Sequence, residues 1–320
     1  MPDARSEATA NGSDAEHLAR AYRYCAAIVR KSGSSFAAAF WLLDRPQRRA
    51  IHAIYAFCRL ADDIADDPGV RGDRTRLLER WRAELDAACE GRSEHPVGIA
   101  LGDAIFRFAL PRELFVELLR GVESDLRGES METFADLRRY CFRVASTVGL
   151  LIVRVLGVTR PSALLYAEEM GIAVQLTNVL RDVTEDAAGG RVYLARQDLE
   201  RFGVVPADLA LRHSAQHAPG EPERSEGGQR ARGERSEPVR LLLACYAERA
   251  RLHYERAEQA LEPADRRALR PAEAMGRIYR HLLETVHREG FPALEAPRRL
   301  SKPRRIAIAA GAWLGLGATA

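Results

Sequence analysis

The chain has 320 residues, a formal net charge of +3, 47% hydrophobic residues and 29% charged residues. This composition is typical of a soluble globular protein and excludes a mostly disordered chain. The charge is too small to indicate a nucleic-acid partner. The five cysteines show no CxxC pair and no zinc spacing, and the first residues are polar rather than a signal peptide, so we expect a cytoplasmic protein.

The first part of the chain is predicted to be a tail followed by a helix. Residues 1–16 are small and polar, and we expect them to be disordered. Helical periodicity occupies residues 17–31 and ends at the sequence SGSSF (32–36), whose serines can cap the next helix. Phe36 and Phe40 follow at a spacing of one helical turn, which by itself indicates core positions.

The stretch 48–67, RRAIHAIYAFCRLADDIADD, is predicted to be one helix with a polar face at its end. Asp62 and Asp66 are four residues apart and lie one turn above the other, and Tyr55 and Arg59 extend the same face. On a solvated surface, such a pair costs only about 0.2–0.5 kcal/mol. In a cleft, at about 5.5 Å and an effective dielectric of about 20, the repulsion is roughly 3 kcal/mol. A buried pair therefore needs a cation, and Mg²⁺ suits carboxylate oxygens.

The middle of the chain continues the helical pattern. A polar helix is expected over residues 73–90, and a long apolar stretch runs from 133 to 158. Asp125 lies near a predicted helix end, where a surface acid is the favoured interpretation; a position close to a metal site is the alternative, and it comes only from the family resemblance described below. No alternation typical of strands persists anywhere, so the predicted fold class is all-α, with one domain around a central cavity.

A second polar face occupies the stretch 175–186, QLTNVLRDVTED. Gln175, Asn178, Asp182 and Asp186 are spaced three, four and four residues apart, which places them on one stripe of a helix. Such a stripe is costly in a dry core but reasonable in a wet cavity. Two helices with paired acids therefore indicate two walls of one metal–diphosphate site.

The last third of the chain contains two segments without an expected place in the core. Residues 212–238 are low in complexity, and we expect a disordered insertion. Residues 306–320 are apolar over 15 residues, fewer than the ~20 that a spanning helix needs. Because the basic run 298–305 precedes this tail, peripheral membrane contact is one interpretation and a docked core helix is an equal alternative.

Several motifs resemble those of the squalene/phytoene synthase family, the head-to-head prenyl synthases. They are SGSSF, YAFCRLADDIADD, YCFRVASTVG, QLTNVLRDVTED, GRVYL and EAMGRIYRHLLE. The resemblance spans residues 17–305 and implies an isoprenoid-synthase-like helical bundle. Within the family, SGSSF and the ending GFPALEAPRRLSKPRR look most like the bacterial presqualene diphosphate synthases of hopanoid pathways. The GRVYL motif departs from the family in having Ala195 where proline is usual.

The resemblance implies a site and a reaction, namely Mg²⁺-dependent condensation of two farnesyl diphosphates to presqualene diphosphate without NADPH. The implied metal ligands are Asp62, Asp66, Asn178, Asp182 and Asp186, with Asp63 as a further candidate. The implied substrate-binding residues are Ser35, Phe36, Phe40, Tyr55, Arg59, Gln175, Asn178, Arg181 and Tyr279. The implied catalytic residues are Tyr140, beside the carbocation, and the arginines Arg59 and Arg181, which would neutralise the diphosphate.

Three alternatives stay open from the sequence. The first is a phytoene synthase that uses geranylgeranyl diphosphate, and the second is a complete squalene synthase. The third is a non-catalytic helical module for assembly or lipid binding, which the presence of every motif acid and arginine disfavours. Head-to-tail chain elongation is disfavoured because it has the pattern DDxxD twice, whereas this chain has DDIAD once and RDVTED once. No sequence signal indicates an oligomeric state.

Overall fold

The structure, a computed structural model, describes residues 4–32, 43–67, 69–210 and 235–291, together with Ser301 and Ile308. Over these residues the chain is helical and contains no strand, which confirms the predicted fold class. The elements are α1 (Ala4–Ser32), α3 (Arg45–Asp66), α4 (Arg74–Cys89), α5 (Pro96–Phe108), α6 (Arg112–Arg127), α7 (Phe134–Cys141), the π-helical turn η1 (Phe142–Ser146), α8 (Thr147–Val155), α9 (Pro161–Ala188), α10 (Arg196–Phe202), α11 (Pro206–Leu209), α12 (Glu237–Ala260) and α13 (Arg266–Arg288).

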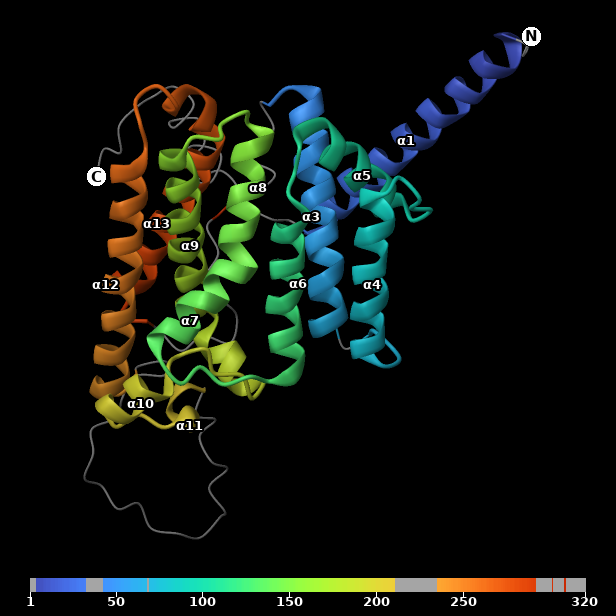
Figure 1. Cartoon of the computed structure of the whole chain (residues 1–320). Coiled ribbons are helices and arrows are strands. Elements are labelled where there is room, and N and C mark those ends of the chain that lie inside the picture. Colours follow the sequence, from blue (N-terminus) through green and yellow to red (C-terminus); the bar gives the residue numbers. More distant parts are fainter. Residues whose placement is uncertain are drawn as a thin grey trace.

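Two hydrophobic clusters hold these helices together. The first joins α1, α3, α4, α5, α6 and α8 with the beginning of α9, the end of α12 and the first part of α13. The second joins α7, the rest of α9, α10, α11, most of α12 and the end of α13. In Figure 1, α12, α13 and α9 stand on one side, α3 and α4 on the other, and α8 and α6 between them. Met170 and Tyr279 are partly buried against both clusters, so they lie at the seam.

Helix α3, which carries the first acidic motif, is fixed at its beginning by a cap and along its length by the first cluster. The side chain of Asp44 accepts a hydrogen bond from the backbone N–H of Gln47 at 2.8 Å. Ile51, Ile54 and Phe57 are buried on one face. The acids follow in the last two turns, on a different face of the helix from the buried alanines of these turns.

Three boundaries differ from the predicted ones. Helix α1 begins at Ala4 and so includes much of the segment 1–16, whose alanines and glutamates favour helix. The apolar stretch 133–158 is divided into α7, η1 and α8 rather than forming one regular helix. Arg235 and the start of α12 fall inside the predicted insertion 212–238, and residues 211–234 lie outside the described part of the chain.

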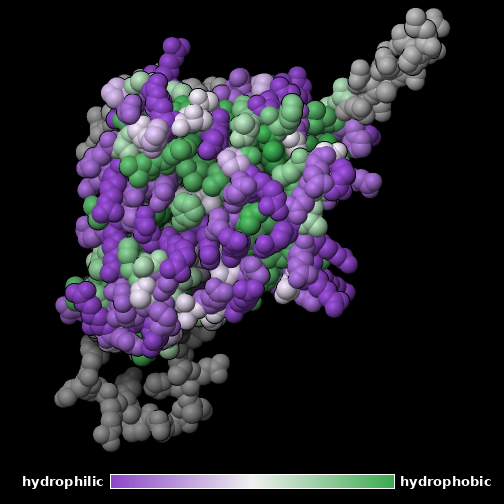
Figure 2. Space-filling view, in the orientation of Figure 1, coloured by the Kyte–Doolittle hydropathy of each residue, from purple (hydrophilic) through white to green (hydrophobic). Residues whose placement is uncertain are grey.

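The lengths and hydropathy of the described helices bear on whether this part of the chain could cross a membrane. None of the described helices is both long and apolar enough to cross a bilayer. On the face shown in Figure 2, hydrophilic side chains cover most of the surface and hydrophobic ones show mainly in recesses between them. The tail 306–320 lies outside the described residues except for Ile308, which is partly buried against the first cluster.

Candidate active site

Five acidic side chains lie near the C-terminal ends of three helices. Asp62 and Asp66 are in the last two turns of α3, Asp125 is in the last turn of α6, and Asp182 and Asp186 are in the last two turns of α9. Neither α3 nor α9 has a basic residue in its last turn. Because a helix C-terminus carries partial negative charge, these carboxylates add to an already negative potential. Figure 1 shows α3 and α6 ending at the same, lower end of the bundle.

Direct and electrostatic contacts join the three helix ends. Arg191, in the loop after α9, forms an ion pair with Asp66 of α3, with 2.6 Å between Nη1 and Oδ1. The charge of Asp125 raises the pKa of Asp62 and also that of Asp186. The structure therefore brings the acids of the two motifs to one site, with Asp125 close to both sets.

The carboxyls of Asp62 and Asp186 have strongly perturbed pKa values. Burial, and then repulsion from Asp66, raises the pKa of Asp62 to about 7. Burial, and then repulsion from Asp182, raises the pKa of Asp186 to about 7. By its accessible surface, however, Asp62 is an exposed residue, so repulsion from Asp66 and the other nearby acids is the firmer cause of the raised pKa. No described side chain forms a hydrogen bond or ion pair with either carboxylate, so a cation would stabilise both ionised forms.

The two motif arginines each pair with an aspartate of their own helix. Arg59 Nη2 lies 2.7 Å from Asp63 Oδ1, and Arg181 Nε donates to Asp182 Oδ1 at 2.7 Å. Tyr279 of α13 also forms a hydrogen bond with Arg181. Asp63 is thus already neutralised, unlike Asp62 on the same helix turn.

The amide pair of the second motif leaves one buried oxygen without a donor. Asn178 Nδ2 donates to Gln175 Oε1 at 3.1 Å. Asn178 Oδ1 is buried and accepts no hydrogen bond from any described residue. A buried polar atom without a partner costs about 1–3 kcal/mol. Because amide oxygens are ligands for hard divalent cations, this orphaned atom fits the proposed metal.

Tyr140 shares the carboxylate of Asp125 with Tyr193. The hydroxyl of Tyr140 donates to Oδ2 and that of Tyr193 to Oδ1, both at 2.9 Å, and the two rings stack with centroids 5.1 Å apart. Burial raises the pKa of both tyrosines. Burial also raises the pKa of Asp125 to about 6, although the two hydrogen bonds oppose this shift.

The interpretation of Asp125 as a surface acid is therefore wrong. It is a lone acid at the end of α6 with no partner at helical spacing, so the pattern that revealed the two motifs could not reveal it. Tyr193 and Arg191 belong to the GRVYL sequence, which pointed to a loop but not to side chains that reach Asp125 and Asp66.

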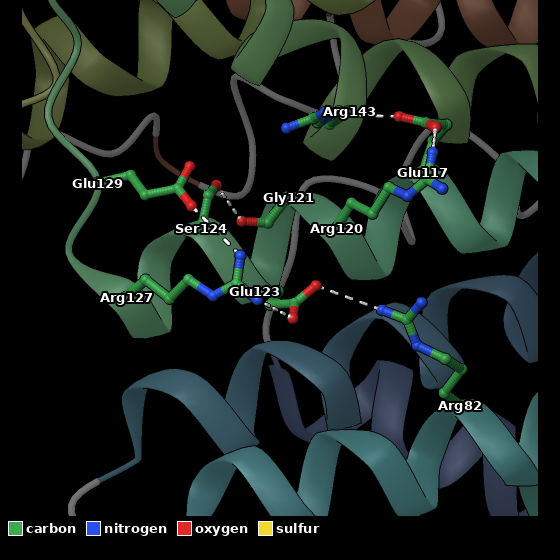
Figure 3. Close-up of polar contacts among 9 residues, drawn as sticks. All are labelled: Arg82, Glu117, Arg120, Gly121, Glu123, Ser124, Arg127, Glu129 and Arg143. Carbon is green, nitrogen blue, oxygen red and sulfur yellow. Dashed lines mark hydrogen bonds and ion pairs between the residues drawn. The ribbon is translucent and has the colours of Figure 1, made fainter.

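Ion pairs on both sides of α6 fix the helix that carries Asp125. Glu117 of α6 pairs with Arg143 of η1 at 3.3 Å, and Glu123 pairs with Arg82 of α4 at 3.4 Å (Figure 3). The first pair ties α6 to the turn that follows Tyr140, and the second ties α6 to α4.

Two glycines allow η1 to pack very closely between α6 and α9. A Cβ atom on Gly121 would lie 2.5 Å from Cγ1 of Val144, and one on Gly171 would lie 2.4 Å from the Cα of Ser146. A π-helical turn of this kind is frequent at functional sites. Here it directly follows α7, whose last turn contains Tyr140, so its packing sets where that hydroxyl lies.

Of the remaining predicted substrate-binding residues, the structure describes only Tyr55. Ser35, Phe36 and Phe40 lie outside the described residues. Tyr55 of α3 is partly buried and lies close enough to Tyr279 to interact with it electrostatically, which places it near the Arg181–Tyr279 pair.

One of the five acids, Asp186, borders a small hollow in the described part of the structure. This hollow is also lined by Val183, Arg191, Tyr193 and Leu209. Within the described ranges, no three His, Cys, Asp or Glu side chains are placed to hold a metal ion by themselves. Mg²⁺ typically takes one or two carboxylates and completes its shell with water and substrate phosphate. A site without three protein ligands among the described residues is therefore compatible with a metal that binds together with a diphosphate.

Comparison with known proteins defines the class of this chain. The family model for squalene/phytoene synthase matches residues 29–305. Presqualene diphosphate synthase from Rhodopseudomonas palustris is 34% identical over 277 residues, which is 86% of this chain and 91% of that protein. A 15-cis-phytoene synthase from Synechocystis sp. is 29% identical, over 92% of this chain and 85% of that protein.

Solved structures give the same class. A dehydrosqualene synthase in complex with a ligand superimposes with a TM-score of 0.77 at 28% identity, over 95% of this chain and 99% of that chain. Squalene synthase HpnC from Alicyclobacillus acidocaldarius gives a TM-score of 0.72 at 26% identity, over 87% of this chain and 97% of that chain. The chain belongs to the squalene/phytoene synthase family, whose members condense prenyl diphosphates head to head.

Proposed function

We propose that this protein condenses two farnesyl diphosphates head to head to presqualene diphosphate, with Mg²⁺ and without NADPH. The observation that carries the proposal is the meeting of three acidic helix ends, of which Asp62 and Asp186 have pKa values raised to about 7. The 34% identity to a presqualene diphosphate synthase supports the choice of product.

The chain offers oxygen ligands from two helices to the metal. Asp62 and Asp66 would hold it from α3, and Asp182, Asp186 and the free Oδ1 of Asn178 would hold it from α9. Bound Mg²⁺ supplies positive charge to the diphosphate leaving group. Arg59 and Arg181 add further positive charge beside it, and their hydrogen-bond donors suit phosphate oxygens.

The tyrosine pair provides a route for the proton. In the overall reaction, two farnesyl diphosphates give one presqualene diphosphate, one free diphosphate and one proton, and the lost proton accompanies closure of the cyclopropane. Tyr140 Oη can accept this proton while its own hydroxyl proton passes to Asp125 Oδ2, 2.9 Å away. Tyr193 holds the other oxygen of the carboxylate and so fixes its orientation. The reaction requires apolar walls that exclude water, which would otherwise quench the cation.

A second candidate is a phytoene synthase. Several phytoene synthases match at 29–31% identity over a similar share of the chain, so the family resemblance alone does not separate the two substrates. The difference depends on the length of the apolar pocket, to which residues outside the described ranges contribute by resemblance.

The experiment is product analysis with purified protein and Mg²⁺. Farnesyl and geranylgeranyl diphosphate are supplied separately, each with and without NADPH. We expect the cyclopropyl diphosphate from farnesyl diphosphate in both cofactor conditions. Preferred turnover of geranylgeranyl diphosphate would support the phytoene synthase, squalene formed only with NADPH would support a complete squalene synthase, and no turnover of either substrate would refute both enzyme candidates.

A further inference from the structure

Behind the acidic end of α9 lies a buried arginine that none of the family motifs includes. Arg235 is 6% exposed and precedes α12. Its Nε donates to the carbonyl of Phe291 at 2.7 Å, its Nη1 to the carbonyl of Leu209 at 2.9 Å, and its Nη2 to the hydroxyl of Thr184 at 2.5 Å. A single guanidinium therefore joins α9, the end of α11 and the segment after α13.

The contact on α9 lies directly behind the acids. Thr184 is two residues from Asp182 and two from Asp186, and it is buried. At about 100° per residue, its side chain leaves the helix on the face opposite to the acidic stripe. Leu209, the second acceptor, also lines the small hollow beside Asp186. Arg235 thus supports the acidic face from its rear side.

The positive charge of Arg235 is buried among neutral hydrogen-bond acceptors. Its three acceptors are two carbonyls and a hydroxyl, and no described carboxylate pairs with it. Burial of a guanidinium is costly, and here burial lowers its pKa to about 10. Arg235 lies on the side of α9 away from the acidic stripe, so what it gives this helix end is a fixed hydrogen bond to Thr184 rather than an ion pair.

We propose that Arg235 is a positioning residue for the diphosphate–metal site, because it holds the last turns of α9 through its hydrogen bond to Thr184. The inference rests on the proposed function for the identity of the ligand. It concerns a residue that contacts neither substrate nor metal and acts through α9.

The test compares R235Q, R235K and T184V with the matched control R240Q, since Arg240 is an exposed arginine on α12. The first readout is binding of Mn²⁺ in the presence of inorganic pyrophosphate, followed by the electron paramagnetic resonance signal of free Mn²⁺, which needs no turnover. Supporting positioning partners typically contribute 10–100-fold to metal affinity, so we expect about tenfold weaker binding for R235Q. T184V should shift binding in the same direction by less, R235K should lie between R235Q and wild type, and R240Q should match wild type.

The second readout separates positioning from folding. With farnesyl diphosphate, R235Q should need more Mg²⁺ for half-maximal rate while its kcat at saturating Mg²⁺ stays near wild type. If R235Q or T184V folds and binds Mn²⁺ like wild type, even with a lower Tm, the proposal is overturned. Should R235Q fail to fold, T184V decides alone. Wild-type protein that binds Mn²⁺ and pyrophosphate but forms no prenyl product would refute the proposed function and leave the role of Arg235 intact.

Discussion

The acidic ends of α3 and α9 carry acids at the same spacing, yet the molecule supports them in different ways. The end of α3 is held by ion pairs that keep contact with solvent, Arg59–Asp63 and Arg191–Asp66. The end of α9 has the buried residues Val183 and Thr184 between its acids and is supported from behind by the buried side chain of Arg235. Similar charge patterns therefore rest on screened surface pairs at one wall and on buried polar contacts at the other.

The difference suggests a division of tasks. Surface ion pairs contribute little to stability and can exchange partners when a charged ligand arrives. Buried polar contacts are costly to break and fix a single arrangement. We expect the α9 wall to be preorganised, and the α3 wall to complete the site when diphosphate and metal bind.

The largest expected effect is loss of turnover when either wall loses its unpaired acid. D62N and D186N should each lower kcat by about 10²–10³-fold. Each substitution removes one carboxylate that would hold the metal, and the metal stabilises the charge that develops on the leaving group. Circular dichroism should show native helix content in both variants, since neither carboxylate has a described partner to lose. E185Q changes an exposed acid of α9 outside the stripe and is the control. Turnover near wild type in D62N or D186N would contradict the two-wall site.

A smaller effect, on stability, is expected at a second buried polar contact near the α9 wall. Asp198 is buried, with Arg249 Nη1 at 2.6 Å and the hydroxyl of Tyr246 at 2.9 Å. We expect D198N to lower the free energy of unfolding by about 2–4 kcal/mol, somewhat less than for a fully buried pair because Arg249 keeps contact with solvent. Urea unfolding at pH 7 measures this loss.

The pH dependence of that loss follows from the pKa of Asp198. Burial alone would raise this pKa, but the hydrogen bonds of Arg249 and Tyr246 outweigh burial and lower it. A carboxyl whose folded pKa is depressed stabilises the protein above its unfolded pKa of about 3.9, and this contribution is lost as the pH falls through the folded value. The gap between wild type and D198N should therefore shrink below about pH 4. A gap that stays constant down to pH 3 would show that the carboxylate charge is not its source.

A smaller loss of stability is expected when the close packing of η1 against the first half of α9 is disturbed at Gly171. G171A would place a Cβ 2.4 Å from the Cα of Ser146, and backbone cannot give way as a side chain can. We expect about 1–3 kcal/mol of lost stability, together with slower turnover because η1 shifts Tyr140 relative to Asp125. In G189A the nearest contact is 3.4 Å, so this control should behave like wild type. A G171A protein with unchanged Tm and unchanged kcat would refute the positioning role of η1.

The sequence predicted the parts of the site that repeat at helical spacing. Asp62, Asp66, Asp182 and Asp186 stand four residues apart, and spacing alone placed each pair on one face. Asp125, Arg191 and Arg235 reach the site, or the wall behind it, through tertiary contacts from single positions, so no local period marks them. The division of 133–158 at η1 likewise depends on Gly121 and Gly171 of other helices. Local pattern predicts the faces of helices, but the contacts between those faces require the packed structure.

The smallest expected effect concerns the ion pair that joins the two walls directly. Arg191 and Asp66 lie 2.6 Å apart, but the side chains are 36% and 57% exposed, so solvent screens the attraction. A double-mutant cycle with R191Q and D66N should give a coupling of about 0.2–1 kcal/mol in the free energy of unfolding. The coupling should fall as salt rises from 0.05 to about 0.5 M, since screening shortens the reach of exposed charges. A larger coupling energy that does not change with salt concentration would mean that the pair is effectively buried. The α3 wall would then be as preorganised as the α9 wall.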